Sequence, residues 1–309
     1  MKRETGVAAI TALLVVAVAA SAAMYMLAQQ SAMLDQATLI ASRAQADAYA
    51  DAGFDWARGV LSEDARSAGS VDYLGEGWAQ PIVALPVDRA LVAGAIDDEQ
   101  GKFNLNNLVV EGKSDADFRI FQRILKQLGL PLELADAVMD WVDADQDVTG
   151  SGGAEDSYYL SLARPYRAAN RPLAQIDELY RVRGFDAATV ARLRPHVTAL
   201  PGTKRTAVNI NTASEAVVTA ILDGKVSQDV ISERLATRAT KPFLSNTDIA
   251  AWAPKADAHA TGTDLGVKSS FFTVRVRVEQ DDIHLAAEAL VQRNPQGGGT
   301  TLLWRRPVY

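Results

Sequence analysis

The stretch VAAITALLVVAVAASAAMYMLA, residues 7–28, contains no charged side chain. As a helix that rises about 1.5 Å per residue it would measure roughly 33 Å, which matches the ~30 Å hydrocarbon layer of a bilayer. The segment therefore predicts a membrane-spanning helix. Two bases, Lys2 and Arg3, precede it. Because positive residues stay on the cytoplasmic side, we expect residues 1–6 in the cytoplasm and the rest of the chain outside it.

Three interpretations of this N-terminus compete. A cleaved secretory signal would have a shorter apolar core, about 7–15 residues, followed by a cleavage site of small residues. A plain single-span anchor would need only the apolar segment. A prepilin-like leader is a short basic segment that ends in Gly and precedes an apolar helix. The sequence MKRETG, residues 1–6, fits this third interpretation, which predicts cleavage on the cytoplasmic side between Gly6 and Val7.

The helix is expected to continue past the membrane. Residues 29–61 contain no Pro, and apolar or small side chains recur there at spacings of three and four, as on one face of a helix. These residues are Met33, Ala37, Ile40, Ala44, Ala48, Ala52 and Trp56. We predict about 50 residues of continuous helix that run from the membrane into a folded domain, as in a pilin-like subunit.

The rest of the chain predicts a small sheet interrupted by helices. Residues 62–90 are polar and predict a loop, and residues 91–97 predict a strand. Residues 114–268 show helical patterns, among them 173–182 and a helix over 216–222 that a capping box starting at Thr212 would begin. Alternation of apolar and polar residues predicts three antiparallel strands at 271–279, 283–293 and 300–306.

This order indicates an α+β fold, in which a long N-terminal helix packs on an antiparallel sheet and a large helical domain is inserted. The expected divisions are a leader (1–6), a membrane helix (7–28), the first part of a pilin-like domain (29–110), an inserted helical domain (111–268) and the C-terminal strands (269–309).

An acidic cluster is the strongest candidate site. Between Gln127 and Ala163 there is no Lys or Arg. The same stretch holds eight acids: Glu133, Asp136, Asp140, Asp143, Asp145, Asp147, Glu155 and Asp156. Carboxylates this close repel one another, and a hard cation with oxygen ligands, best Ca²⁺, relieves the repulsion. The pattern departs from an EF-hand, because Val148 stands where the turn Gly belongs and Glu155 comes one residue late. The alternative is a solvated acidic loop.

Composition excludes several classes of protein. The 309-residue chain has no Cys and three His, so disulfides, zinc–thiolate sites and iron–sulfur clusters are excluded. A net charge of −7 argues against a protein that coats nucleic acid. No nucleophile motif and no phosphate-binding loop accompany the carboxylates, so we predict that the chain is not an enzyme.

Several runs resemble one known family, the K minor pseudopilins of Gram-negative type II secretion (general secretion pathway protein K). The matching runs span the chain: the leader and helix with Thr11 where pilin-like subunits carry Glu, GKFNLNNL (101–108), DWVDAD (140–145), GAEDSYYL (153–160), PYRAANRPL (165–173), ELYRVRGFD (178–186) and VNINTA (208–213).

The resemblance implies a periplasmic protein anchored in the inner membrane, cleaved and N-methylated by prepilin peptidase. It implies a complex with the I and J minor pseudopilins at the tip of the pseudopilus, where Thr11 suits a subunit without a predecessor. Other implied partners are the H minor and G major pseudopilins, with secreted substrates or the secretin as further candidates. By motif, calcium binding falls on Asp140, Asp143, Asp145, Glu155 and Asp156, whereas Asp147 lies where the family varies more.

A second interpretation comes from VNINTA (208–213) and LYRVRGF (179–185), which resemble helix-hairpin-helix modules that bind DNA phosphates. It would make the chain a membrane-anchored DNA-binding protein of an uptake apparatus. Such modules need surrounding Lys and Arg. Residues 204–245 have a net charge of only +2, so we predict no nucleic-acid partner.

Overall fold

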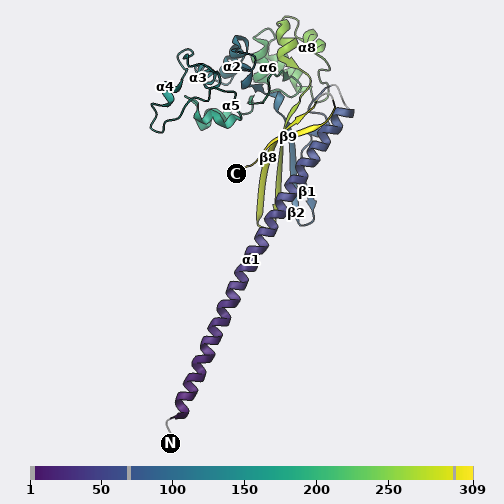
Figure 1. Ribbon diagram of the computed structural model, residues 1–309. Coiled ribbons are helices and arrows are strands. Elements are labelled where there is room, and N and C mark those ends of the chain that lie inside the picture. The colour runs from purple at the N-terminus through teal and green to yellow at the C-terminus, as the bar shows by residue number, and fades with distance from the viewer. Residues whose placement is uncertain (1–3, 68–70, 295–296, 309) are drawn as a thin grey trace.

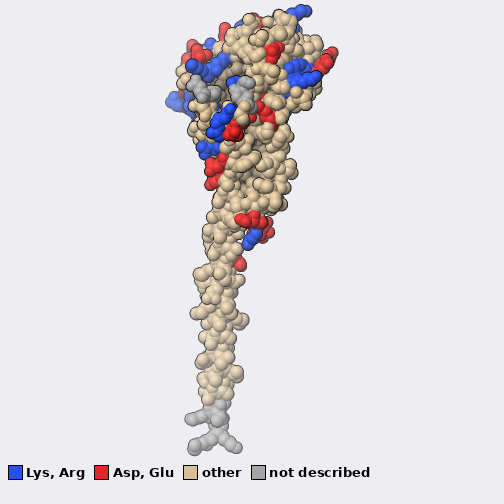
Figure 2. All heavy atoms as spheres, turned by 90° about the vertical axis from the view of Figure 1, so that its right-hand side faces the viewer, with Lys and Arg blue, Asp and Glu red and all other residues tan. Residues whose placement is uncertain are grey.

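A long helix carries a broad head at its far end (Figure 1). The computed structural model describes residues 4–67, 71–294 and 297–308, so the first three residues of the expected leader lie outside the described part. Helix α1, Glu4–Ser67, is 64 residues long. Within the described ranges it is the one helix that is long and apolar enough to cross a membrane. Figure 2 shows charged side chains gathered on the head, while most of the projecting stalk carries none.

The apolar stripe that predicted the helix is not the face of α1 that packs on the sheet. Met33, Ile40 and Trp56 of that stripe are each more than half exposed. The buried side chains are Ala46, Ala50, Phe54, Ala57 and Leu61. Small residues bring the helix close to the sheet, since a Cβ on Gly53 would lie 3.0 Å from a methyl carbon of Val276. Both faces of α1 are apolar, and periodicity alone does not tell which of them the protein's own sheet covers.

Five antiparallel strands form the sheet, in the order β1-β2-β7-β8-β9. Helix α1 covers one face (Figure 1). Alternation along β7 places Val274 and Val276 in the core and leaves Arg275 and Arg277 exposed. The predicted helix-on-sheet fold is thereby confirmed. The strands are β1 Ile82–Val87, β2 Ala90–Asp98, β7 Phe271–Gln280, β8 Ile283–Arg293 and β9 Thr300–Pro307.

The predicted loop over 62–90 was wrong at both ends. Helix α1 continues to Ser67, because residues 62–67 contain no Pro or Gly and Asp64 on its last turns is 2.7 Å from Arg293 of β8. Strand β1 pairs with β2 through a tight turn at Asp88, where φ is 49°. Pro86 is tolerated because β1 is an edge strand, which can lack an N–H donor.

The other part of the head is helical and has its own apolar core. Two short parallel pairs connect its loops, β3 (Phe103–Asn104) with β4 (Val197–Thr198) and β5 (Val208–Asn209) with β6 (Leu265–Gly266). Phe103 stacks on Phe121 of this core, with ring centroids 6.3 Å apart. The helices are α2 Asp115–Gln127, α3 Leu134–Val142, α4 Asp156–Tyr159, α5 Ala187–Leu193, α6 Glu215–Leu222, α7 Gln228–Ala236 and α8 Asn246–Trp252.

Two local predictions in this part were wrong. Over 173–182 the chain forms only a 3₁₀ helix, η4 (Ile176–Arg181). The residues before it do not join the helix, because Gln175 is extended and Leu173 N donates to the Asn106 side chain instead. Thr212 does not cap α6, which begins after Ser214. The Thr212 hydroxyl instead donates to Asp98, 2.6 Å away.

Buried polar side chains join the two parts of the head. The Asp98 carboxylate accepts hydrogen bonds from Asn209 and Ser269, at 2.9 and 2.6 Å. Arg293 pairs with Asp72, which also accepts a 2.7 Å hydrogen bond from Ser269 N. These groups lie where the chain leaves the sheet after β2 and returns to it before β7. Their hydrogen bonds therefore fix how the helical part sits on the sheet.

Candidate metal centre

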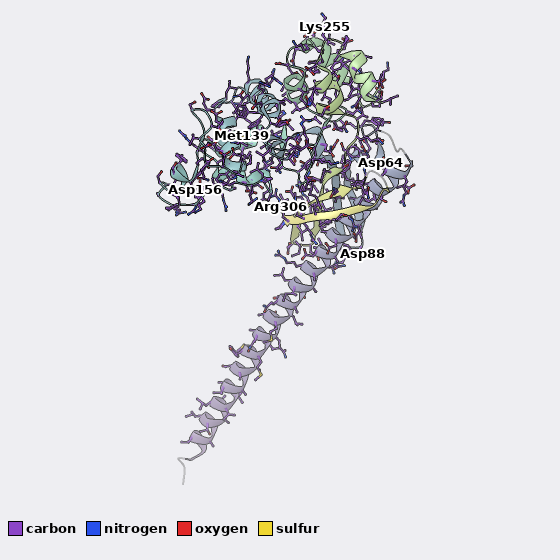
Figure 3. The ribbon with its side chains drawn as sticks, turned by 45° about the horizontal axis from the view of Figure 1, so that its top comes forward. Asp64, Asp88, Met139, Asp156, Lys255 and Arg306 are labelled. Carbon is purple, nitrogen blue, oxygen red and sulfur yellow. The ribbon has the colours of Figure 1, made fainter. Side chains whose placement is uncertain are left out.

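The acidic segment folds around the end of α3, on the side of the head where Figure 3 labels Met139 and Asp156. Asp140 is fully buried, and its two carboxylate oxygens accept hydrogen bonds from Thr149 N at 3.0 and 3.2 Å. Asp136 accepts a 3.1 Å hydrogen bond from Gly152 N. Only Gly fits at position 153, where the loop backbone passes close to the Asp140 carboxylate, because a Cβ there would lie 2.3 Å from an oxygen of Asp140. These two acids therefore shape the loop that follows the helix.

Three of the predicted ligands, Asp143, Asp145 and Glu155, lie close together at the two ends of this loop. Asp143 ends α3, and Glu155 precedes α4. Together with Asp145 they offer carboxylate oxygens that all lie within 4.8 Å of one another. Asp143 and Glu155 are buried, with 3% and 2% of their surface exposed, whereas Asp145 is exposed. The arrangement brings together three oxygen ligands that are separated by up to twelve residues in sequence.

The electrostatics of this cluster are unfavourable without a cation. Both Glu155 carboxylate oxygens are buried and have no hydrogen-bond partner among the described residues. Burial, followed by repulsion from Asp140, Asp143 and Asp145, raises the pKa of Glu155 to about 7. Burial also raises the pKa of Asp143. Buried carboxylates without partners are costly, and a hard cation ligated by oxygen would supply the missing interaction. The residues present therefore fit Ca²⁺.

The other three predicted ligands, Asp140, Asp147 and Asp156, are not members of this cluster, and Asp140 is held by Thr149 N as described above. The exposed Asp147 contributes its backbone N–H, which donates to Asp145 at 2.9 Å. The Asp156 carboxylate forms an ion pair with Arg167, at 2.8 Å, and accepts a hydrogen bond from the N–H of Ala168, at 3.0 Å. Because the carboxylate oxygens that converge are those of Asp143, Asp145 and Glu155, the geometry favours these three residues as the ligands.

Sequence reasoning missed two residues beside the cluster. The Lys113 ammonium lies 2.9 Å from Asp143 and 2.8 Å from Asp145. The Asn170 amide donates to the Asp145 carbonyl, while its own Oδ1 is buried and has no hydrogen-bond partner in the described part of the chain. Both residues are distant in sequence from the acidic run, so no local spacing pointed to them. Asn170 lies within the PYRAANRPL run, which gave the one available signal.

At the other end of the molecule, Thr11 lies on α1 inside the apolar segment. Its hydroxyl donates to the carbonyl of Ala8, at 2.9 Å. The polar group is thus satisfied by its own helix, which makes Thr compatible with a membrane environment. Gly6 and Val7 both lie on α1.

Comparisons with known proteins agree with the fold. The family model for protein K of the type II secretion system matches residues 101–202. Protein K from Aeromonas hydrophila is 33% identical, with 94% of each chain covered, and protein K from Pseudomonas aeruginosa is 35% identical, covering 95% of this chain and 90% of the relative.

Among solved structures, a chain of the GspK–GspI–GspJ complex from the type 2 secretion system of enterotoxigenic Escherichia coli is similar. The TM-score is 0.75 at 27% identity, over 86% of this chain and 96% of that chain. The similarity covers most of both chains and supports the α+β, helix-on-sheet fold described above. With relatives above 30% identity over nearly its whole length, this chain belongs to the type II secretion system protein K family.

Proposed function

We propose that this chain is the minor pseudopilin that caps the tip of a periplasmic pseudopilus and helps to start its assembly for export of folded proteins. The observation that carries the proposal is the position of the helical part, which sits on the end of the head away from the stalk (Figure 1). A domain of this size over the sheet leaves little room for a subunit stacked ahead of it, as expected at a tip.

Two features of α1 support an assembled state. The buried face begins at Ala46, so about 17 residues separate the apolar segment from the region that the sheet covers. Met33, Leu34 and Ile40 in this interval are exposed. Apolar side chains on an uncovered helix indicate contact with other helices. Because the similar solved structure is a complex with GspI and GspJ, we propose the I and J minor pseudopilins as the partners.

The N-terminus supports the proposed processing and orientation. Lys2 and Arg3 would keep the first residues in the cytoplasm, with the head in the periplasm. Cleavage between Gly6 and Val7 and N-methylation would give a mature chain with Thr11 at its fifth position. A Glu at that position would need an amine partner within the membrane, whereas Thr11 needs none. A subunit with no predecessor fits this property.

Calcium binding in the helical part is the third element of the proposal. Asp143, Asp145 and Glu155 would hold the ion, with Asn170 beside them. The bound ion would neutralise the cluster and close the loop between α3 and α4. Because the chain has no cysteine, the bound ion would stabilise this loop in the way that a disulfide does in other proteins of an oxidising compartment.

Co-purification tests the assembly. Residues 29–309 would be co-expressed with the periplasmic parts of the I and J pseudopilins, and the complex would be isolated by a tag on J. A stoichiometric complex of the three supports the proposal. Recovery of I and J without this chain, at micromolar concentrations and with calcium present, contradicts it. Substitution of Thr11 by Glu tests the position in the filament, since a tip subunit gains no function from that acid.

A further inference from the structure

Lys113 is placed where a cation is needed. It lies in the chain between the 3₁₀ helix η3 (Leu105–Leu108) and α2, so it approaches the acidic cluster from a separate segment. Its Nζ lies 2.9 Å from an oxygen of Asp143 and 2.8 Å from an oxygen of Asp145. Those two residues are also two of the three acids whose oxygens converge. The ammonium group thus contacts the same carboxylates that would bind the ion.

An ammonium group at this position competes with a calcium ion for the same carboxylates. Calcium sits about 2.3–2.6 Å from its carboxylate oxygens. With Lys113 Nζ at 2.9 Å from Asp143, an ion bound to the same oxygen would lie within about 5.5 Å of the ammonium. The two cations would repel at that separation, and Lys113 contacts an oxygen of each of two carboxylates that the ion would use. Calcium binding and the Lys113 ion pairs therefore oppose each other, and the ion binds more tightly once Lys113 has moved away.

Lys113 is also able to leave. Its side chain is 42% exposed, whereas that of Asp143 is 2% exposed. The lysine can swing into solvent without uncovering any core, while the carboxylate stays in place. Gly112 precedes it with φ of +96°, in a region that restricts other residues but not Gly. The retained ligands would be the buried Asp143 and Glu155, whose oxygens lack other hydrogen bonds among the described residues.

We propose that Lys113 is a tethered competitor of calcium: its ammonium group neutralises Asp143 and Asp145 in the calcium-free protein and is displaced when the ion binds. The inference rests on the proposed calcium site and deepens it. Lys113 then has two consequences of opposite sign. It weakens calcium binding, and it holds the loop closed when calcium is absent.

The test uses the full-length protein in detergent micelles with the variant Lys113→Met, which keeps the apolar stem and removes the charge. Calcium affinity would be measured by isothermal titration calorimetry, and stability by urea unfolding with EDTA and with saturating calcium. We expect Lys113→Met to bind calcium about tenfold more tightly, which corresponds to 1.4 kcal/mol. We also expect it to be less stable than the wild type in EDTA and equal to it in calcium. Lys255→Met, at the other end of the helical part (Figure 3), is the matched control that removes one charge elsewhere.

A second measurement follows the displacement itself. The rate of acetylation of Lys113, relative to the exposed Lys255, would be measured by mass spectrometry with and without calcium. Release from the carboxylates should raise the Lys113 rate several-fold when calcium is added. Unchanged labelling, or equal destabilisation of Lys113→Met with and without calcium, overturns the inference and leaves the calcium site standing. Absence of calcium binding by both proteins overturns the site and the inference together.

Discussion

Glu155 should make the calcium-free protein sensitive to pH. In the folded protein its pKa is raised from an ordinary value of 4.5 to about 7, by burial and by the neighbouring carboxylates. Between these two values the folded protein binds more protons at this position than the unfolded chain does. The free energy of unfolding must then fall as the pH rises through that window. The stabilisation is fully present below pH 4.5 and is lost above pH 7.

The two pKa values set the size of the effect. One pKa unit corresponds to about 1.4 kcal/mol, so this shift is worth about 3 kcal/mol in total. Between pH 5 and pH 8 the change should be about 2–3 kcal/mol. Burial raises the pKa of Asp140 and Asp143 as well, so the overall pH dependence is not due to Glu155 alone. The informative quantity is the difference in unfolding free energy between wild type and Glu155→Gln at the same pH.

Urea unfolding in EDTA, followed by tryptophan fluorescence at pH 5 and pH 8, measures this difference. The wild type should lose about 2–3 kcal/mol relative to Glu155→Gln on going from pH 5 to pH 8. Saturating calcium should reverse the trend, because the ion binds the ionised carboxylate and competes with the proton. A difference between the two proteins that is constant to about 0.5 kcal/mol across this range would refute the reasoning.

Three further predictions test other parts of the molecule. Asp143→Ala should abolish most of the rise in melting temperature that calcium produces, while Asp147→Asn, outside the cluster, should keep it; equal loss in both would contradict the assigned ligands. Arg293→Met leaves Asp64 and Asp72 without their partner and should lower the unfolding free energy by about 3–5 kcal/mol in urea; a loss below about 1 kcal/mol would show that the junction tolerates the unpaired acids. Gly6→Glu should give an uncleaved precursor that still inserts, seen as an intact N-terminal peptide by mass spectrometry, and the same intact peptide in the wild type would disprove cleavage.

Local sequence patterns predicted the elements whose conformation follows from the residues within them. The uncharged segment and its extension predicted α1, and alternation predicted β7 because Val and Arg there face opposite sides. The patterns did not predict which face of α1 is buried, or that residues 82–87 form strand β1 although they include Pro86. The buried face of α1 depends on partners far away in sequence, such as Val276 beside Gly53 and Arg293 beside Asp64. Strand β1 depends on its pairing with the neighbouring strand β2.

The candidate site was likewise predicted only in part from the sequence. Its acids were visible as a run without Lys or Arg, but the run did not separate ligands from acids with other roles. Asp140 holds the loop through Thr149 N, and Asp156 is paired with Arg167. Lys113 lies outside the run altogether. A carboxylate's role is set by the donor that reaches it, and the donors here come from other segments.

The junction between the two parts of the head illustrates why polar contacts specify the shape of this molecule. Among the described residues, the large apolar clusters of the helical part and of the sheet are separate, and a small third cluster joins Leu200 of the helical part to Phe271 and Leu290 of the sheet. Apolar contact is non-directional and would permit several orientations. The hydrogen bonds that Asp98 accepts from Asn209 and Ser269 have narrow distance and angle requirements. Orientation of the helical part on the sheet, and with it the form of the proposed tip, therefore depends on these buried polar groups more than on the two cores they join.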